Sequence, residues 1–438
     1  GISESLQRIN GMFAIALFDK KLSKLTLVRD RIGEKPLYYG RSGGDFFFSS
    51  ELKAFHLWPN FTPEISRSAV QSFLEFGFIP APLSIYSDVF KLKPGNLIEI
   101  QDGVVLKQSA YWDLDAKIQT IEKRQDDESV FLSDLEALLS DSVALRMHSD
   151  VPTGTFLSGG IDSSLITALI QSQSEKKYSS YTIGFEDVAF DESEAARKIA
   201  RFVGTDHTEY KISNSELLSI IPDLPHVFCE PFADQSQIPT ILVSQLARQD
   251  VTVILSGDGG DEIFGGYNRH LTSRKLSQVS DTLPSGVRSL IAPALRGKYE
   301  DRIAGIARTL GREVSGNQLD KLARLFDKHS SEDLYSNYLG IPQSRTLLSS
   351  GHGVADIQSF TREFPTLCAG ESIMANDQLF YLPENILVKL DRSSMANRLE
   401  TRVPFLDHRV IEFGWTLPLK YKIQRGTGKV LLRKLLYK

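Results

Sequence analysis

Residues 156–169 read FLSGGIDSSLITAL, and this stretch decides the class of fold. A short apolar run, TGTFL at 153–157, leads into it, and apolar residues recur at helical spacing directly after the glycine pair Gly159 and Gly160. A strand that passes through a glycine turn into a helix gathers backbone N–H groups and the positive end of the helix dipole at one point. The pattern therefore predicts an anion site at the end of a buried strand.

The acidic residue inside this turn indicates which kind of anion the site binds. The common phosphate loop, GxxxxGK[ST], places a lysine on the β and γ phosphates of a nucleotide. Here Asp162 stands in the turn without a lysine, while Ser158, Ser163 and Ser164 supply hydroxyls. A carboxylate beside phosphates is favourable when a divalent cation lies between them, and Mg²⁺ is usually held by one or two carboxylates plus phosphate oxygens. The stretch therefore predicts a site for a magnesium nucleotide.

Strand and helix patterns alternate from Pro152 onward. This order predicts βαβ units and a parallel sheet between helices, an open α/β fold that binds ligands at the carboxyl ends of its strands. The predicted strands are 153–157, 179–185, 207–212 and 251–257, and the predicted helices are 159–173, 191–204, 215–228 and 238–248. After about residue 268 the pattern becomes mostly helical, with weak strand signals.

A second turn rich in glycine and carboxylates follows the last of these strands. It reads LSGDGGDEIFGGY at 255–267 and repeats the order of apolar strand, Ser-Gly turn, glycines and acids. A single turn of this kind is most often only a tight turn with a capping aspartate. Two such turns at the ends of parallel strands in one domain favour a shared site, in which Asp261 is the partner of Asp162 on one magnesium ion.

The N-terminal part is predicted to be a separate α+β domain. Runs rich in aromatic and β-branched residues predict strands, and 66–78 has helical spacing. A polar, charged stretch follows and is predicted to be a linker, which ends in an amphipathic helix at 130–148. The predicted strands are 12–19, 24–30, 36–40, 45–50 and 95–103, and the predicted division is 1–112, linker 113–127, and 128–438.

Composition limits the partners that the chain can have. Its 438 residues are 41% hydrophobic with a net charge of −5, which predicts a soluble protein of two or three domains and gives no reason to expect nucleic acid or an anionic membrane as a partner. No apolar run is long enough for a membrane span, and GISESLQRIN is unlike a signal peptide, so we expect a cytoplasmic protein. Cys229 and Cys368 stand far apart outside any CxxC motif, which argues against a disulfide or a zinc site.

These motifs carry a resemblance to a known family. SGGIDSS resembles the pyrophosphate-binding loop of the ATP-pyrophosphatase superfamily. With LSGDGGDEIFGGY, with 182–207 and with LVKLDRSSMANRLETRVPFLDHRVIEF at 387–413, the chain resembles bacterial glutamine-dependent asparagine synthetases over essentially its whole length. NGMFAIALFD, LVRDRIGEKPLYYG and FSSELKAF are similar to the later part of that family's glutaminase domain.

The resemblance implies a fold and an activity. It implies a partial β-sandwich of the Ntn-hydrolase-like, class II glutamine amidotransferase type at 1–112. It also implies an adenine nucleotide α-hydrolase-like domain, truncated at its C-terminus, at 128–438. In the family, the side-chain carboxylate of aspartate attacks the α-phosphate of ATP and releases pyrophosphate, and ammonia from glutamine then displaces AMP to form the amide of asparagine. The implied partners are small molecules, with a homodimer as the expected assembly.

The resemblance also implies roles for individual residues. Leu157, Ser256 and Gly257 are expected to contact the nucleotide, Ile183 to line the adenine pocket, and Asp258 to take an acidic position of the second loop. Lys389 and Arg392 are expected to face pyrophosphate as catalytic cations, with solvated charges on a helix as the open alternative. The full nucleotide-binding set is Leu157, Ser158, Gly159, Gly160, Asp162, Ser163, Ser164, Ile183, Ser256, Gly257 and Asp258, and Asp162 and Asp261 serve as both metal ligands and catalytic residues.

The chain departs from the family pattern at two places. The family's glutaminase uses an N-terminal cysteine, whereas residue 1 is Gly1, so we expect a fragment without its glutaminase nucleophile and without glutaminase activity. The loop expected to border the acyl-acceptor pocket, CEPFADQSQIP at 229–239, has no basic residue for a substrate carboxylate. Its Glu230 and Asp234 are expected to favour an ammonium group instead.

Two other functions stay open from the sequence. One is a related ligase that amidates or cyclises a different carboxylate, and the other is an inactive nucleotide-binding remnant. The intact pair Asp162 and Asp261 argues against the remnant.

Overall fold

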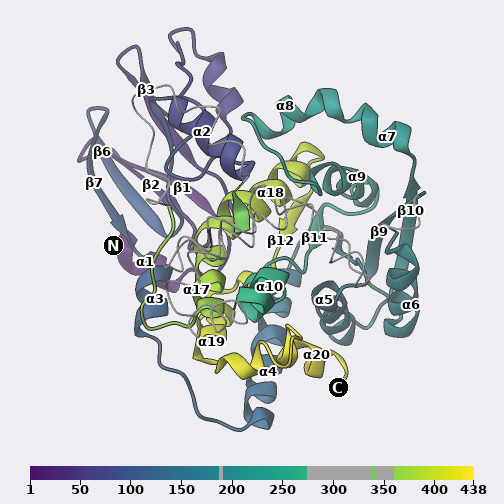
Figure 1. Cartoon of the computed structure of the whole chain (residues 1–438). Helices are drawn as coiled ribbons and strands as arrows, with labels where there is room; N and C mark the ends of the chain where they lie inside the picture. The colour runs from purple at the N-terminus through teal and green to yellow at the C-terminus, as the bar shows by residue number, and fades with distance from the viewer. Residues whose placement is uncertain (187–190, 274–334, 336–337, 341–359) are drawn as a thin grey trace, which may run out of the picture.

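The protein is a two-part α/β structure in which a long helix lies between the parts. In this computed structural model, Figure 1 shows the N-terminal strands, in purple, on one side and the sheet that contains β9 (Ser179–Phe185) and β10 (Asp206–Ile212), in teal, on the other. Helix α18 (Leu387–Ala396) runs between them. The described residues are 1–186, 191–273, 335, 338–340 and 360–438. Most of the predicted helical region after residue 268 therefore lies outside the described residues.

Two antiparallel sheets form the N-terminal part, in the orders β1-β2-β6-β7 and β4-β3-β5. Leu27, Leu37, Leu92 and Ile98 belong to one buried cluster in this part, as the apolar strand patterns predict. The sequence patterns did not predict β5, which is too short to show alternation, or β7, whose side chains are mostly exposed. The strands are β1 (Ala14–Asp19), β2 (Lys24–Arg29), β3 (Tyr38–Ser42), β4 (Asp45–Ser49), β5 (Val89–Lys91), β6 (Asn96–Gln101) and β7 (Val104–Ala110).

Short helices complete this part and run into the predicted linker. Ser66 caps α2 by accepting a hydrogen bond from Ala69 N, and Gly77, with φ +81°, ends it. Helix α3 lies inside the stretch predicted as a linker and buries Leu114 and Ile118, so this stretch packs on the core instead of hanging free. The helices are α1 (Ile2–Arg8), η1 (Leu52–Leu57), α2 (Arg67–Phe76) and α3 (Leu114–Thr120).

The second sheet is parallel, as predicted, in the order β10-β9-β8-β11-β12. The chain runs from β8 outward to β9 and β10, then returns to the other side of β8 to form β11. Open α/β sheets form their ligand crevice where the strand order reverses in this way. The remaining strands are β8 (Thr153–Phe156), β11 (Val253–Leu255) and β12 (Glu400–Arg402).

Two details of this domain differ from the sequence-based prediction. The helix predicted at 215–228 is broken into α7, η3 and α8, with Pro222 and Pro225 in the first turns of the last two. ETRVPFLD, predicted to pack the helical region on the sheet with Glu400 and Arg402 as a structural pair, does form that ion pair, at 2.7 Å, but it also contributes β12 to the edge of the sheet, which the weak strand signals after residue 268 did not predict. The helices are α4 (Glu128–Met147), α5 (Ile161–Ser172), α6 (Ser193–Val203), α7 (Asn214–Ser219), η3 (Ile221–Asp223), α8 (Leu224–Phe228), α9 (Gln237–Ala247), α10 (Gly260–Phe264), α17 (Ala369–Asn376), the π-helix η5 (Asp377–Ile386), η6 (Pro404–Leu406), α19 (His408–Thr416), η7 (Leu419–Tyr421) and α20 (Val430–Leu436).

One hydrophobic core joins the two parts. Ile32 and Trp112, from the N-terminal part, belong to the same buried cluster as Leu390 and Phe413 of the second. Trp112 also donates a hydrogen bond from its indole nitrogen to Glu412, at 3.0 Å. Within the described ranges, no helix has the length and apolar character to cross a membrane.

Candidate nucleotide site

A cavity of about 450 Å³ opens at the carboxyl ends of β8 and β11, where the strand order reverses. Loops from both strands form one wall, and β9, α9, α18 and the residue before α20 form the others. The cavity therefore lies where the sequence predicts a ligand. The predicted site residues that line it are Leu157, Ser158, Gly160, Asp162, Ser163, Ile183, Ser256, Gly257, Asp258, Asp261 and Lys389.

The turn after β8 is built as the sequence predicts. Gly159 has φ +77°, and a Cβ there would lie 2.8 Å from the Cβ of Ala195, so only glycine fits between the turn and α6. Ser158 and Ser163 hold their hydroxyls 3.0 Å apart at the mouth of the turn. No side chain caps α5, so the backbone N–H groups of its first turn are open to an anion.

The second glycine turn packs directly against the first. A Cβ on Gly257 would lie 2.7 Å from the backbone nitrogen of Ser163, and a Cβ on Gly260 would lie 2.5 Å from Cγ of Asp162. Both distances are too short for any other residue without movement of the neighbouring loop. The glycines of GDGGD thus allow the two strand ends to approach until Asp162 and Asp261 share one cation.

That cation is a lysine that the sequence analysis missed. Nζ of Lys429 lies 2.6 Å from Oδ2 of Asp162 and 2.7 Å from Oδ1 of Asp261. Lys429 has φ +58° and stands directly before α20, after the glycines of GTGK. A lysine between a glycine turn and an apolar helix was the available signal.

Burial and neighbouring charges shift the pKa values of Asp162 and Lys429. Burial raises the pKa of Asp162 to about 7, against the attraction of Lys429. Burial disfavours the ammonium of Lys429, but the attraction of Asp162 and Asp261 raises its pKa above the ordinary value. Oδ1 of Asp162 is buried and accepts no hydrogen bond from the described residues.

The two carboxylates fit a magnesium ion. Oδ1 of Asp162 has no hydrogen-bond partner among the described residues, and the side chain of Asp261, which is 35% exposed, lies close to Oδ2 of the same carboxylate because both contact Nζ of Lys429. The described residues contain no group of three or more His, Cys, Asp or Glu side chains arranged for a metal. Mg²⁺ at a nucleotide is usually bound by one or two carboxylates together with phosphate oxygens. This pair therefore suits a magnesium ion that binds together with a nucleotide.

Apolar side chains also line the cavity. Leu157 and Ile183, both predicted to contact the nucleotide, line it together with Phe185, Pro239 and Val243. Side chains of this kind suit a flat heteroaromatic ring such as adenine.

The remaining predicted residues fall into two groups. Asp258 lines the cavity and accepts a hydrogen bond from Oγ of Ser256 at 2.5 Å, whereas Ser164 is buried and donates to Gly160 O at 2.6 Å, which stabilises the helix start. Gly159 lies on the neighbouring open face, with Gly160 and Lys429.

The two cations predicted on α18 point in different directions. Lys389 lines the cavity, and no carboxylate of the described residues pairs with it. Arg392 does not line this cavity: it is 3% exposed, donates to Ser50 O at 2.6 Å and lies 3.5 Å from the carboxylate of Glu51. Residues three apart on a helix lie only about 60° apart around its axis, so helical spacing places both on one face and only the packing around the helix separates their roles.

The residues of the stretch predicted to border the acceptor pocket also lie in two different places. Ser236 and Pro239 line the cavity. Glu230 does not, because its carboxylate is 2.6 Å from Nζ of Lys91 in the N-terminal part. The expectation that Glu230 favours a substrate ammonium is therefore wrong, and no cation of this loop reaches the cavity.

A parallel α/β sheet with two glycine turns and paired carboxylates at its switch point defines a nucleotide-binding domain of the ATP-pyrophosphatase class. A family model described as "Asparagine synthase" matches residues 134–438, and one described as "Glutamine amidotransferase domain" matches residues 1–112. The chain belongs to the asparagine synthase family.

Named relatives agree with this assignment. The chain is 31% identical to asparagine synthetase [glutamine-hydrolyzing] 1 of Bacillus subtilis, over 98% of the chain and 66% of that protein. It is 34% identical to the putative asparagine synthetase [glutamine-hydrolyzing] 2 of Methanocaldococcus jannaschii, over 92% of the chain and 75% of that protein. The chain thus spans about two thirds to three quarters of the length of these relatives.

A solved structure of a glutamine-dependent NAD⁺ synthetase from Acinetobacter baumannii, in complex with adenosine diphosphate, is 14% identical. It covers 77% of this chain and 82% of its own, with a TM-score of 0.25.

Proposed function

We propose that the protein is an ATP-dependent carbon–nitrogen ligase that converts aspartate to asparagine. The carboxylate oxygen of aspartate attacks the α-phosphorus of ATP, the bond from that phosphorus to the pyrophosphate oxygen breaks, and aspartyl-adenylate forms. Ammonia then attacks the acyl carbon, the carbon–oxygen bond to AMP breaks, and the nitrogen loses a proton as the amide forms. The pairing of Asp162 and Asp261 at the switch point, in a cavity that apolar side chains also line, is the observation that carries this proposal.

The residues of the two turns support a role in holding pyrophosphate as a leaving group. The N–H groups at the start of α5 and the hydroxyls of Ser158 and Ser163 face one point and suit the β and γ phosphates. Lys429 and Lys389 supply positive charge at the cavity wall as negative charge builds on the departing group. The turn needs no lysine of its own, because the γ-phosphoryl group is not transferred.

Magnesium, held by Asp162 and Asp261, would neutralise charge on the phosphates and orient them. Lys429 occupies the space between these carboxylates in the free protein, so its ammonium would have to move toward the phosphates when the ion enters. Ile183 and Leu157 would hold the adenine ring and thereby fix the α-phosphate relative to the acceptor.

Lys389 is the cation that suits the acceptor. Its ammonium lines the cavity without a carboxylate partner among the described residues, so it is available to the α-carboxylate of aspartate or to a phosphate. This supports an anionic acceptor even though the loop at 229–239 brings no cation to the cavity.

The direct test is AMP and pyrophosphate formation with ATP, magnesium, ammonium chloride and L-aspartate. We expect both products with aspartate and none without it. Asp162→Asn should abolish product formation and leave the circular dichroism spectrum unchanged. Asp150→Asn, an exposed aspartate near the opposite end of β8, should behave as the wild type. Product formation by Asp162→Asn at the wild-type rate would refute the role given to the carboxylate pair.

Ammonia, not glutamine, as the nitrogen donor of this chain, a homodimer, a cytoplasmic location and the division of the chain at residues 112 and 128 stay part of this proposal. Glutamine-dependent turnover, sedimentation velocity, cell fractionation and limited proteolysis, respectively, test them.

A further inference from the structure

The loop at the acceptor side of the cavity is held by the N-terminal part of the chain. Ala233 donates a backbone hydrogen bond to Gly77 O at 2.7 Å, and Cys229 packs against the buried cluster that contains Phe55 and Ile79. Further along, Ser236 at the end of this loop and Pro239 in the first turn of α9 line the cavity. The wall of a site in the second domain thus rests on residues of the first.

Glu230 is the centre of this attachment. Its side chain is 5% exposed, and its carboxylate lies 2.6 Å from Nζ of Lys91. It also accepts a hydrogen bond from the backbone nitrogen of Ile85 at 3.1 Å, and the hydroxyl of Tyr38 lies 3.5 Å away. Every one of these partners belongs to the N-terminal part, so the position of Glu230 reports the position of that part.

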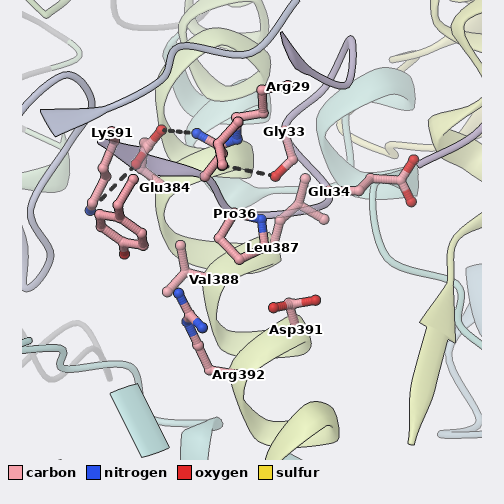
Figure 2. A pocket seen from close by; sticks show the side chains of 12 residues that line it. Arg29, Gly33, Glu34, Pro36, Lys91, Glu384, Leu387, Val388, Asp391 and Arg392 are labelled. Carbon is pink, nitrogen blue, oxygen red and sulfur yellow. Dashed lines mark hydrogen bonds and ion pairs between the residues drawn. The ribbon is translucent and has the colours of Figure 1, made fainter. Parts of the chain in front are cut away.

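Lys91 connects the loop to a second carboxylate. Figure 2 shows Lys91 and Arg29 on either side of Glu384, which comes from η5, with the ammonium 3.7 Å and the guanidinium 3.8 Å from its two oxygens. Lys91 also donates to Ile79 O. The enclosed space beside these side chains is only about 10 Å³, about the size of one water molecule, so Lys91 has little room to move.

A buried charge pair of this kind is costly to desolvate and is weak support for stability in itself. Its contribution is geometrical, because a buried carboxylate that loses its cation must move or take up a proton. Glu230 stands six positions before Ser236 in the same loop, so its displacement is transmitted to the cavity wall.

We propose that the Lys91–Glu230 pair positions the acceptor loop, so that the amidotransferase-type part sets the affinity of the ligase site for its carboxylate acceptor. This inference rests on the proposed function. Lys91 and Glu230 are positioning residues that act through the loop, and neither contacts the cavity.

The variants that test this are Lys91→Met and Glu230→Gln, with ammonium chloride as nitrogen donor so that no glutaminase step enters. We expect the KM for aspartate to rise about tenfold or more, since small displacements of positioning groups have effects of that order, while the KM for ATP stays within about twofold. Lys91→Arg keeps the charge and should restore most of the aspartate affinity. The double variant should be no worse than the worse single variant.

Lys35→Met is the matched control. Lys35 also crosses between the two parts, 2.9 Å from Asp391, but does not touch the acceptor loop. Its KM for aspartate should match the wild type. An equal rise in Lys35→Met, or an unchanged KM in both Lys91→Met and Glu230→Gln, would overturn the proposal.

Amide hydrogen exchange gives a readout that does not depend on turnover. Exchange of residues 229–236 should rise in Lys91→Met and Glu230→Gln but not in Lys35→Met, and unchanged exchange in the first two also counts against the inference. Failure of the proposed function would show differently, as absence of AMP and pyrophosphate from the wild-type protein with aspartate. A variant too unstable to purify would be replaced by Glu230→Asp, which keeps the charge but shortens the side chain and should give an intermediate KM.

Discussion

Lys429 lies 2.6 Å from Asp162, the acidic residue of the first glycine turn, and so supplies from the far end of the chain the positive charge that the turn lacks. The same ammonium is 2.7 Å from Asp261. One cation therefore bridges two carboxylates that line the cavity.

Replacing Lys429 should slow the reaction strongly. Lys429→Met leaves two close carboxylates without a counter-charge and removes a positive group from the pyrophosphate end of the cavity. We expect pyrophosphate release to fall roughly 100-fold or more, the effect typical of losing one electrostatic contact to a developing charge. Lys434→Met, in α20, whose lysine pairs with Glu128 at the surface, should retain the wild-type rate. Equal activity of the two variants would show that Lys429 has no role in the reaction.

The carboxylate pair should determine the affinity for metal. In Asp261→Asn one of two anionic ligands is lost, so Mn²⁺ binding in the presence of a non-hydrolysable ATP analogue should weaken by roughly 10- to 100-fold. Electron paramagnetic resonance of free Mn²⁺ measures this without turnover. An affinity equal to that of the wild type would show that Asp261 is not a ligand.

The close packing of the two turns predicts a steric effect at Gly260. Gly260→Ala places a Cβ 2.5 Å from Cγ of Asp162, although the backbone conformation at Gly260 tolerates alanine. We expect AMP formation to fall at least about tenfold because the carboxylate must move. Gly370→Ala in α17, where the nearest atom would be 3.4 Å away, should leave the rate unchanged. Similar rates for the two variants would mean that the two turns can move apart enough to accommodate the added Cβ.

Glu34, a buried glutamate that does not line the cavity, predicts a pH effect on stability. Burial, followed by the nearby charge of Asp30, raises the pKa of Glu34 to about 8 from an ordinary value of 4.5. The folded protein thus keeps a proton that the unfolded chain has lost, so this contribution to stability is complete below pH 4.5 and is lost as the pH rises through 8.

Glu34→Gln cannot ionise, so its melting temperature should fall less than that of the wild type between pH 5 and pH 8. At about 2–4 °C for each kcal/mol, the two curves should separate by a few degrees. Differential scanning fluorimetry measures this, with the exposed Glu194→Gln as control. Parallel curves for the wild type and Glu34→Gln would show that Glu34 is ionised in the folded protein.

The sequence predicted those parts of the fold that depend on neighbouring residues. The alternation of strands and helices and the two glycine turns follow from local spacing, so β8, β9, β10 and β11 were predicted close to their observed bounds. β12 has only three residues, Glu400 to Arg402, and pairs with a strand far away in sequence, so nothing local marks it.

Only some of the site residues could be predicted from the sequence. Asp162 and Asp261 stand in recognisable turns, whereas Lys429 reaches them only through the packing of α20. Arg392 and Glu230 were assigned to the cavity because of their place in a motif or a loop. Both instead point into the N-terminal part, where Ser50 O and Lys91 supply partners that no local pattern reveals.

The 267 positions between Asp162 and Lys429 have a consequence for the order in which the protein matures. At elongation rates of about 5–20 residues per second, the first turn is synthesised roughly 15–50 s before the lysine that joins its carboxylate to that of Asp261. Until Lys429 has been synthesised, the Asp162 and Asp261 carboxylates lack this counter-charge. The contact that joins the two turns can therefore form only after residue 429 has been synthesised, and a nascent chain that stops short of α20 carries both acidic turns without it.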